Sequence, residues 1–584
     1  MPQKLSRIDR FYGGIVNNDK STIIGAALNL EELDIFTNES YIQAETVLSQ
    51  DSSTTGGSPV IADGTGRRIW GFTVDDADNL YALSDDAASP AKAKIWKLAN
   101  ASSTDPGNFA AFFTSAQNAR GSNYASNIIW HGLGDPITTA YLYYVTGTNS
   151  LYRYGDIKGT PSESSVGTLS GITATSRYIP MIRFDGELFI GHGQFIAKVD
   201  DGGVFAGTAF TLPNEYECVD FDVLGDTMAI LARNVRTGSN ASRVFLWDMV
   251  ATTGADDEII IPMGGPQAIV NHGETLKVFC VSNNNLRIYE LTGKVPIKIH
   301  ETLCDTTQTL TSSEYSIYYN SVFVKNNIAY FGLGKTLTNN NAGIYSLGKA
   351  GEDKSLALLL SKRYTTVNSI STKTHIPLAA IDVGPNIYVS YVNNIASPTY
   401  NVSRTEENNS PSRSSNGVYE SLWIDAGSPE YTKDWTGFVL SVKSMPASYN
   451  IIVDARVDNA SSYNTVDIVS WLGAWATSTA YIVGDGVSVS GFAYVCTSAH
   501  TSGSTTQPGV GADWATKWNL LNSIILNSTN DQTDSGMTAD RFWERSWTGL
   551  VGKQIQIKLR FTSSTTSTPQ LYSMGLLSET RNLL

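Results

Sequence analysis

Short segments in which apolar and polar residues alternate recur along most of the chain. Each has an alternating strand, a short polar turn and a second strand that ends in an aromatic residue followed by Gly, Asp or Lys. YLYYVTGTNSLYRYGD (141–156) and TLKVFCVSNNNLRIYELTG (275–293) are two clear copies. Alternation of period two predicts half-buried antiparallel strands. The units begin at Asn79, Tyr141, Glu187, Thr227, Thr275, Ile328 and Asn386.

The spacing of these units indicates a repeat architecture. Successive starts lie between 40 residues apart (Glu187 to Thr227) and 62 residues apart (Asn79 to Tyr141). This is near the length of a four-stranded propeller blade and above the roughly 20–29 residues of most solenoid coils. We therefore predict an all-β fold with a β-propeller of about seven blades over residues 61–417. Residues 1–60 would close or dock the propeller. A large β-sandwich or a solenoid of similar hairpins is the alternative.

The pattern changes after the Ser/Asn-rich stretch 401–417, which is typical of a loop or linker. Alternating strands follow in 419–459, and a matching half returns only in 547–577. Neither half makes a full pair of sheets by itself. We therefore predict one β-sandwich formed by residues 418–470 and 521–584, with an inserted module over residues 471–520.

The inserted segment is rich in aromatic residues. We interpret it as a three-stranded mini-sheet whose few long residues are aromatic, and aromatic rings suit stacking on the apolar faces of pyranose sugars. The same rings are also suited to form the core of the module, because so small a sheet has little else to bury. The candidate carbohydrate-binding residues are Trp475, Tyr481, Tyr494, Trp514 and Trp518.

Three segments resemble known families. The inserted segment is similar to the small carbohydrate-binding modules of families 5 and 12, which occur on chitinases and on phage tail proteins. The opening, 10–36, resembles the start of phage tail propeller proteins, and 553–570 resembles their sandwich endings. The resemblance implies a tailed-bacteriophage tail protein, of the nozzle, hub, tail-tip or fibre type. In the inserted segment the matching residues are Trp475, Tyr481, Gly484, Asp485, Val487, Gly491, Tyr494, His500, Pro508 and Trp514.

Composition narrows the classes of partner. Only 16% of the 584 residues are charged, and the net charge is −14. This acidic composition disfavours non-specific binding to nucleic acid, which needs Lys and Arg to displace counterions. Acidity does not exclude a conduit, since a lumen along which DNA slides should avoid basic side chains.

The sequence shows no convergent catalytic or metal-binding pattern. The four cysteines, Cys218, Cys280, Cys304 and Cys496, form no C-x-x-C pair, so we expect buried or half-buried free thiols. The six histidines are scattered. GLGKT (332–336) lacks the first glycine of a phosphate-binding loop and is expected to be a blade turn. The acidic run 75–78 is expected to be a solvated turn rather than a calcium site. We predict no catalytic residues, no metal and no cofactor.

These patterns favour a non-enzymatic structural protein of a phage tail. Its expected partners are other tail proteins, further copies of itself in a ring or fibre, and a host-surface glycan. Residues 1–11 lack the apolar core of a signal peptide, and no apolar run approaches about 20 residues. We expect synthesis in the host cytoplasm and a final place in the virion tail. The alternatives are a polysaccharide-degrading enzyme anchored by the module, and a structural protein whose module no longer binds sugar.

Overall fold

The structure is a computed structural model. Nearly all regular structure in it is β-strand, which confirms the predicted all-β class; the α-helix found among the described residues is α1 (Trp514–Lys517). No helix in that part of the chain is long and apolar enough to cross a bilayer. The residues that the structure describes are 4–8, 15, 27–31, 33–36, 42–44, 48–50, 69–85, 91–103, 109–119, 127–134, 136–155, 161–172, 178–236, 242–282, 285–303, 315–335, 343–349, 359–364, 376–393, 399–405, 417–442, 450–458, 460–461, 463–468, 471–481, 485–490, 492–520, 541–562 and 570–581.

The chain divides into two compact units. The first unit comprises Met1–Val47, Lys349–Arg363 and Asn409–Leu584, and the second comprises Leu48–Gly348 and Tyr364–Asn408. Each unit therefore contains segments that lie far apart in the sequence.

The second unit consists of antiparallel sheets, each built from consecutive strands. The first sheet contains β6 (Ile69–Val74), β7 (Leu80–Asp85), β8 (Lys92–Leu98) and β9 (Ala110–Asn118). The second contains β10 (Ile128–Leu133), β11 (Thr139–Val145), β12 (Ser150–Gly155) and β13 (Ser162–Thr168). The third contains β14 (Met181–Phe184), β15 (Glu187–His192), β16 (Phe195–Val199) and β17 (Phe205–Thr211). The fourth contains β18 (Tyr216–Leu224), β19 (Thr227–Asn234), β20 (Ser242–Trp247) and β21 (Asp257–Ile261).

The remaining sheets of this unit follow the same plan with two departures. The fifth contains β22 (Pro266–His272), β23 (Thr275–Ser282), β24 (Asn285–Thr292) and β25 (Val295–Leu303). In the sixth, β26 (Tyr315–Ile317) and β27 (Phe323–Lys325) both pair with β28 (Ile328–Lys335), which pairs with β29 (Gly343–Gly348). The last sheet contains β31 (Ile376–Val383), β32 (Asn386–Asn393) and β33 (Thr399–Thr405), and its outer strand is β5 (Leu48–Gln50).

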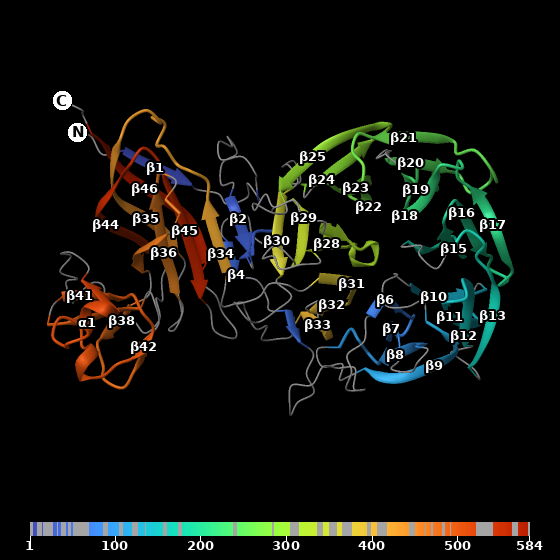
Figure 1. The fold of residues 1–584 in the computed structure, drawn as a ribbon, viewed down its shortest axis with the longest axis horizontal. Coiled ribbons are helices and arrows are strands. Elements are labelled where there is room, and N and C mark those ends of the chain that lie inside the picture. The colour runs from blue at the N-terminus through green and yellow to red at the C-terminus, as the bar shows by residue number, and fades with distance from the viewer. Residues whose placement is uncertain are drawn as a thin grey trace. The chain divides into compact units, whose positions relative to one another are not determined.

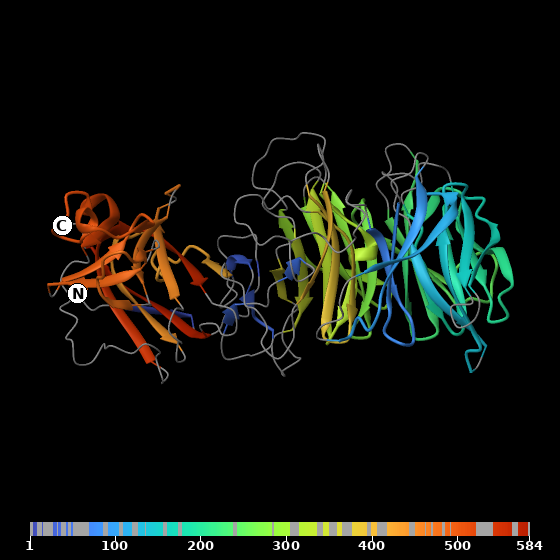
Figure 2. The same ribbon diagram turned by 90° about the horizontal axis from the view of Figure 1, so that it is seen from below.

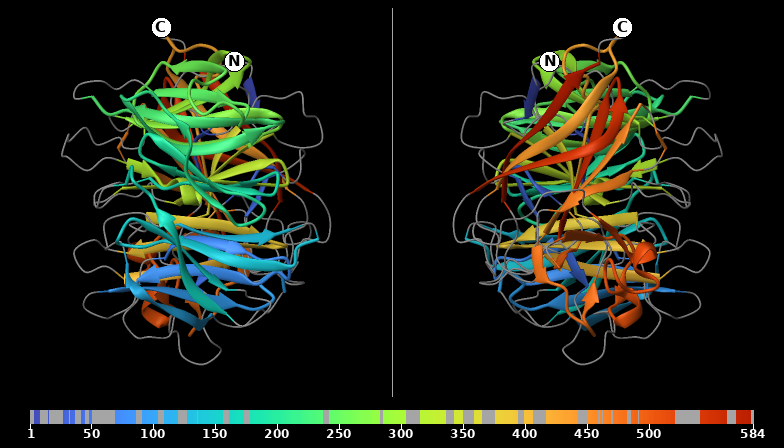
Figure 3. Two further views of the ribbon diagram at one scale, coloured as in Figure 1. Left: turned by 90° about the vertical axis from the view of Figure 1, so that its right-hand side faces the viewer. Right: turned by 90° about the vertical axis from the view of Figure 1, so that its left-hand side faces the viewer.

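These sheets form a closed ring. The first strand of each sheet contacts the first strand of the next, in the order β6, β10, β14, β18, β22, β26 with β27, and β31. Strand β31 in turn contacts β6, which closes the circle (Figure 1). The strands run roughly along the axis of the ring (Figure 2), and the outer strands form its rim (Figure 3, left). The second unit is therefore a β-propeller.

The predicted repeat units correspond to the second and third strands of the sheets. Tight turns join the first and second strands, and several place both central residues at positive φ, as type I′ hairpin turns require. Examples are Asp185 with Gly186, at φ values of 48° and 76°, and Asn326 with Asn327, at 50° and 58°. Asn, Asp and Gly tolerate this left-handed backbone better than other residues do, so these turns set where each hairpin begins.

The seam between the first and last sheets is tightly bonded. Asn386 Nδ2 donates to the carbonyl oxygens of Ala101 and Ser103, at 3.0 and 2.8 Å. Ser390 Oγ donates to the carbonyl oxygen of Ile69 at 2.9 Å. At the rim, β5 pairs antiparallel with β33. The apolar core of the seam contains buried residues of both sheets, among them Ile69, Leu80, Trp96, Leu98, Ala379, Val383, Tyr388 and Val402.

The first unit contains two groups of paired strands. One has the order β3 (Leu33–Asp34), β4 (Ile42–Ala44), β46 (Gln570–Thr580), β35 (Lys433–Val442) and β44 (Arg541–Gly552), with β1 (Lys4–Ile8) also paired with β46. The other has the order β2 (Ala27–Glu31), β34 (Gly417–Ser421), β45 (Ile555–Thr562), β36 (Asn450–Val457) and β37 (Asn464–Ile468), and β30 (Leu359–Tyr364) pairs in parallel with β2. The two groups contact each other through β36 with β44 and through β4 with β45.

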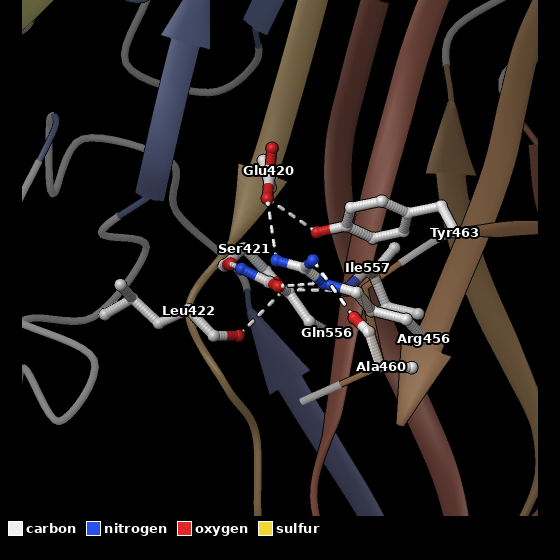
Figure 4. Close-up of polar contacts among 8 residues, drawn as sticks. All are labelled: Glu420, Ser421, Leu422, Arg456, Ala460, Tyr463, Gln556 and Ile557. Atoms are coloured by element: carbon white, nitrogen blue, oxygen red, sulfur yellow. Dashed lines mark hydrogen bonds and ion pairs between the residues drawn. The ribbon is translucent and has the colours of Figure 1, made fainter. Parts of the chain in front are cut away.

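A polar network fixes the register of the second group of strands (Figure 4). Arg456 Nε donates to Gln556 Oε1 at 2.7 Å, and Arg456 Nη2 donates to Glu420 Oε1 at 3.4 Å. Tyr463 Oη donates to the same Glu420 oxygen at 2.7 Å, and Gln556 Nε2 donates to the carbonyl oxygen of Ser421 at 2.7 Å. Gln556 is fully buried. Because its amide is satisfied on both sides, a slip of β45 against β34 or β36 would leave buried polar groups unpaired.

We expect the seam to contribute measurably to the stability of the propeller. Asn386→Leu keeps the branched shape of the side chain but removes both donors, and leaves the fully buried Ala101 carbonyl one hydrogen bond short. The free energy of unfolding should fall by about 1–3 kcal/mol, measured by urea denaturation of the whole chain. Asp226→Asn, in the exposed turn between β18 and β19, is the control and should change little. Equal stability of Asn386→Leu and the wild type would contradict the role of this contact.

Candidate functional site

The inserted module is a small β structure with more strands than expected. Its main sheet has the order β38 (Trp471–Ala474), β40 (Gly486–Val489), β41 (Phe492–Cys496) and β43 (Trp518–Leu520). A second ladder joins β39 (Ala480–Tyr481) to β42 (His500–Thr501). The prediction of a three-stranded sheet was therefore wrong. Strand β38 lies at the start of the predicted module and pairs in parallel with β40; its four residues, WLGA, include no polar residue, so they show no alternation of period two.

Three of the five candidate aromatic residues lie in the core of the module. Tyr481, Tyr494 and Trp518 are 3%, 6% and 1% exposed. Trp518 Nε1 donates to the carbonyl oxygen of Thr506 at 2.8 Å, and Tyr481 Oη accepts a hydrogen bond from Ala476 N at 2.8 Å. The rings of Tyr481 and Trp518 meet edge to face, with centroids 5.0 Å apart. Both polar tips are used internally, so these side chains stabilise the module itself.

Trp475 and Trp514 differ from the other three candidates because each is half-buried. Trp514, on α1, packs edge to face against Tyr494, with centroids 5.8 Å apart. Trp475 follows β38 and packs on the same core cluster. These two rings are the ones with surface left for a ligand. Among the described residues, no ring contact joins them to each other.

A cysteine and a histidine meet inside the module, but their environment does not activate the thiol. Cys496 Sγ lies 3.8 Å from His500 Nδ1, and that nitrogen also lies 2.8 Å from the carbonyl oxygen of Ser498. Burial raises the pKa of the Cys496 thiol to about 11, so it stays protonated near neutral pH. Cys218 and Cys280 are likewise free and buried, as predicted for these three cysteines, whereas Cys304 lies outside the described residues.

The propeller has a cavity that the sequence did not predict. It has a volume of about 530 Å³ and lies between turns of the third and fourth sheets. Lys198 Nζ is paired with Glu187 Oε1 at 2.7 Å, and Gly134 N donates to Asp201 Oδ1 at 2.8 Å. The cavity therefore combines apolar and acidic groups, which suits contact with hydroxylated or cationic molecules. Its lining residues are Phe184, Asp185, Glu187, Phe189, Lys198, Asp200, Asp201, Gly202, Asp248 and Met249.

Two sequence motifs have structural explanations. Asp75 Oδ1 accepts hydrogen bonds from Ala77 N and Asn79 N, both at 2.9 Å, and Asp75 Oδ2 accepts one from Tyr81 Oη at 3.0 Å. This carboxylate organises the turn between β6 and β7, in line with the turn interpretation. Residues 332–335 lie within strand β28 rather than in a blade turn, so that expectation was wrong. A glycine is needed at 332 because a Cβ there would lie 2.5 Å from Pro377 Cβ.

The described histidines are separate, and among the described residues no three His, Cys, Asp or Glu side chains are placed so that they could hold a metal ion together. His131, His192 and His272 are buried, and His375 lies outside the described residues. His192 Nδ1 accepts a hydrogen bond from Gly171 N at 3.2 Å, and Nε2 lies 3.0 Å from the carbonyl oxygen of Gly207. Burial lowers the pKa values of His131, His192 and His300 to about 4. These rings are therefore neutral parts of the blades at physiological pH.

No protein-family model matches the sequence, and no curated protein matches it. Among solved structures, the chain is similar to a puromycin-hydrolysing peptidase of Mycobacterium tuberculosis, with 11% identity and a TM-score of 0.41. That match covers 65% of this chain and 61% of the peptidase, so this chain spans less than two thirds of it. The Dos1 propeller matches with 10% identity and a TM-score of 0.37, over 68% of this chain and 95% of that one. The β-propeller domain of the trilobed protease from Pyrococcus furiosus matches with 10% identity and a TM-score of 0.35, over 58% and 94%. The fold assignment rests on the sheet topology described above.

The buried histidines predict a pH dependence of stability. The pKa of His131 is about 4 in the folded state, against about 6.5 in an unfolded chain. The unfolded state therefore binds more protons between these values, and stability is lost as the pH falls from about 6.5 to 4. In His131→Leu, the slope of unfolding free energy against pH in this window should decrease by up to about 1.4 kcal/mol per pH unit. The measurement is urea denaturation at a series of pH values.

The matched control for this experiment is Tyr143→Phe. The ring of Tyr143 lies 5.7 Å from that of His131, and burial raises the pKa of Tyr143, so this group does not titrate between pH 4 and 6.5. The control should keep the wild-type slope. An unchanged slope in His131→Leu would show that this ring does not take up a proton on unfolding.

Proposed function

We propose that this chain is a non-enzymatic structural protein of a tailed-phage tail, at a nozzle or hub position or at a tail tip or fibre. The observation that carries the proposal is the pairing of a closed scaffold with a small appended module. The ring is closed by contacts between successive inner strands, while the module leaves two tryptophan rings half-buried. The sequence resemblances described above point in the same direction.

We further propose that the propeller has seven blades. Six sheets run in order from β6–β9 to β26–β29, and the last contains β31–β33 with β5 as its outer strand. The inner strands follow one another without omission, and β31 returns to β6. An outer strand supplied from ahead of the first sheet is a common way to close such a ring without an open edge.

We propose that the part of the first unit that surrounds the inserted module in the sequence is a β-sandwich. Strand β45 buries Ile555, Ile557, Leu559 and Phe561. Strand β35 buries Trp435, Leu440 and Val442 in a similar alternation, and the two groups of strands contact each other. Two facing sheets with alternating buried residues are the arrangement expected of a sandwich.

Host-surface glycan is the proposed ligand of the module, through Trp475 and Trp514. Binding would occur by stacking of the rings on sugar faces, without a reaction and without a cofactor. The other proposed partners are further tail proteins and further copies of this chain in a ring or fibre. The net charge of −14 suits a lumen that does not retain DNA. The protein would be made in the host cytoplasm and reside in the virion tail.

A polysaccharide-degrading enzyme is the second candidate, and the cavity of the propeller favours it. Five acidic side chains, Asp185, Glu187, Asp200, Asp201 and Asp248, line this cavity. Pairs of carboxylic acids carry out most glycoside hydrolysis. Incubation with host envelope glycans followed by an assay for released reducing ends separates the two functions. Turnover that is lost in Glu187→Gln and Asp248→Asn would replace the structural proposal with the enzymatic one.

The test of the structural proposal is a reconstruction of the native particle in which the density of this chain is located. We expect several copies arranged around the tail axis in a ring, or three copies in a fibre. Particles that lack this chain altogether would reject the proposal.

We expect Trp475→Ala and Trp514→Ala each to weaken glycan binding by about 2- to 12-fold, because an aromatic contact contributes about 0.5–1.5 kcal/mol. Binding of the whole chain to chitin and to host envelope polysaccharide would be measured by affinity electrophoresis and calorimetry. Trp423→Ala, a half-buried tryptophan outside the module, is the matched control and should leave binding unchanged.

Trp518→Ala is a second reference, because it removes a 1% exposed ring from the core and should unfold the module. Binding that survives in both Trp475→Ala and Trp514→Ala would mean that these rings do not contact sugar. If the wild-type chain does not bind glycan, that result would support the alternative in which the module no longer binds sugar.

A further inference from the structure

The inner strand of the sixth sheet is interrupted at its middle. Strands β26 and β27 both pair with β28: Ile317 lies opposite Leu333, and Phe323 lies opposite Tyr330. Residues 318–322, five in number, therefore lie opposite only residues 331–332. The extra residues form the 3-10 turn η1 (Tyr319–Ser321). An interruption of this size removes the turn from the ladder and directs it away from its own sheet.

The turn reaches two sheets that are not neighbours of each other. Asn320 Nδ2 donates to the carbonyl oxygen of Trp70, in β6 of the first sheet, at 2.6 Å. Tyr319 Oη accepts a hydrogen bond from Ile179 N at 3.2 Å, in the segment that leads into β14 of the third sheet. Ring contacts accompany both bonds: Tyr318 lies 6.3 Å from Trp70, and Tyr319 lies 6.2 Å from Tyr178.

The turn is fitted into the interior of the ring. Tyr319 and Ser321 are 6% and 0% exposed, and η1 contacts the inner strands β6, β22 and β31 of other sheets as well as β28 of its own sheet. Ser321 Oγ accepts a hydrogen bond from Gly332 N at 3.2 Å and so replaces the ladder partner that the interruption removed. Gly332 has no side chain in the way, whereas a Cβ there would lie 2.8 Å from Ser321 Oγ. The backbone groups released by the interruption are thus satisfied rather than left exposed.

We propose that residues 318–322 form an axial brace, which ties the first, third and sixth sheets together across the centre of the propeller. In a ring held only by contacts between neighbouring sheets, one boundary between two sheets (a seam) opens without disturbing the other boundaries. The brace couples seams that do not adjoin, so opening any one of them also requires the central contacts to break. The propeller therefore opens as a single unit, which suits a scaffold that must resist mechanical load. This inference does not depend on the proposed phage function.

Residue-resolved hydrogen exchange on the whole chain tests the brace. Tyr319→Phe removes the acceptor of the Ile179 amide while keeping the ring. We expect the Ile179 amide to exchange about tenfold faster, because the loss of one buried hydrogen bond partner lowers the cost of local opening. Since the carbonyl oxygen of Pro180 accepts a hydrogen bond from Gly191 N within the third sheet, the Gly191 amide should also exchange faster.

A second variant replaces residues 318–322 by two glycines, so that the inner strand has one residue opposite each of residues 331 and 332 of β28. Exchange should then rise together in β6 and β14, while the amides of β41 in the other unit serve as the internal reference. Asp226→Asn, at a remote exposed turn, should change neither region. Unchanged exchange of Ile179 and Gly191 in Tyr319→Phe would overturn the brace, even if the shortened variant fails to fold. A rise confined to the sixth sheet in the shortened variant would overturn it as well.

Discussion

The propeller depends on the contact of each sheet with the next, because its apolar core consists of clusters that lie between neighbouring sheets. Between the fourth and fifth sheets, Asp220 Oδ2 accepts a hydrogen bond from Ile269 N at 2.9 Å, and Asp222 Oδ2 accepts one from Asn271 N at 2.7 Å. Between the first and second sheets, Thr73 Oγ1 does the same for Trp130 N at 2.8 Å. Burial raises the pKa of Asp220 because it disfavours the charged carboxylate, and the hydrogen bond from Ile269 N opposes this effect. Polar side chains thus satisfy backbone groups that neighbouring inner strands leave unpaired.

The sequence predicted the second and third strands of the sheets because both faces of these strands are buried against neighbouring sheets. Their residues are dense in Val, Ile, Leu and aromatics, as in β23, whose burial is almost continuous. The first and outer strands were not assigned. Strand β18 contains the buried Asp220 and the half-buried Asp222, and β13 (SESSVGT) is largely polar and partly exposed, so neither shows a clear alternation. The interruption of the sixth inner strand was also beyond prediction, since its partners Trp70 and Ile179 are distant in the sequence.

The sequence predicted which aromatic residues the module contains, but not which of them form its core and which are available to a ligand. The sequence identified the aromatic cluster of the module, and it left open whether those rings form a core or a binding surface. Trp518 and Tyr481 lie in the core because their polar tips find backbone partners there, which is a tertiary fact. The acidic cavity was missed for a related reason. Its residues come from turns between Phe184 and Met249, in two different sheets, and each turn alone is an ordinary surface feature.

The rim strand β5 has a practical consequence for anyone who divides this polypeptide. It contributes three residue pairs to β33, from Leu48 opposite Thr405 to Gln50 opposite Ser403. A fragment that starts at the first full sheet would leave the outer side of β33 without its partner. Bare strand edges of this kind recruit one another, so such a fragment would tend to self-associate through intermolecular pairing. Soluble, monodisperse material therefore calls for a start upstream of Leu48.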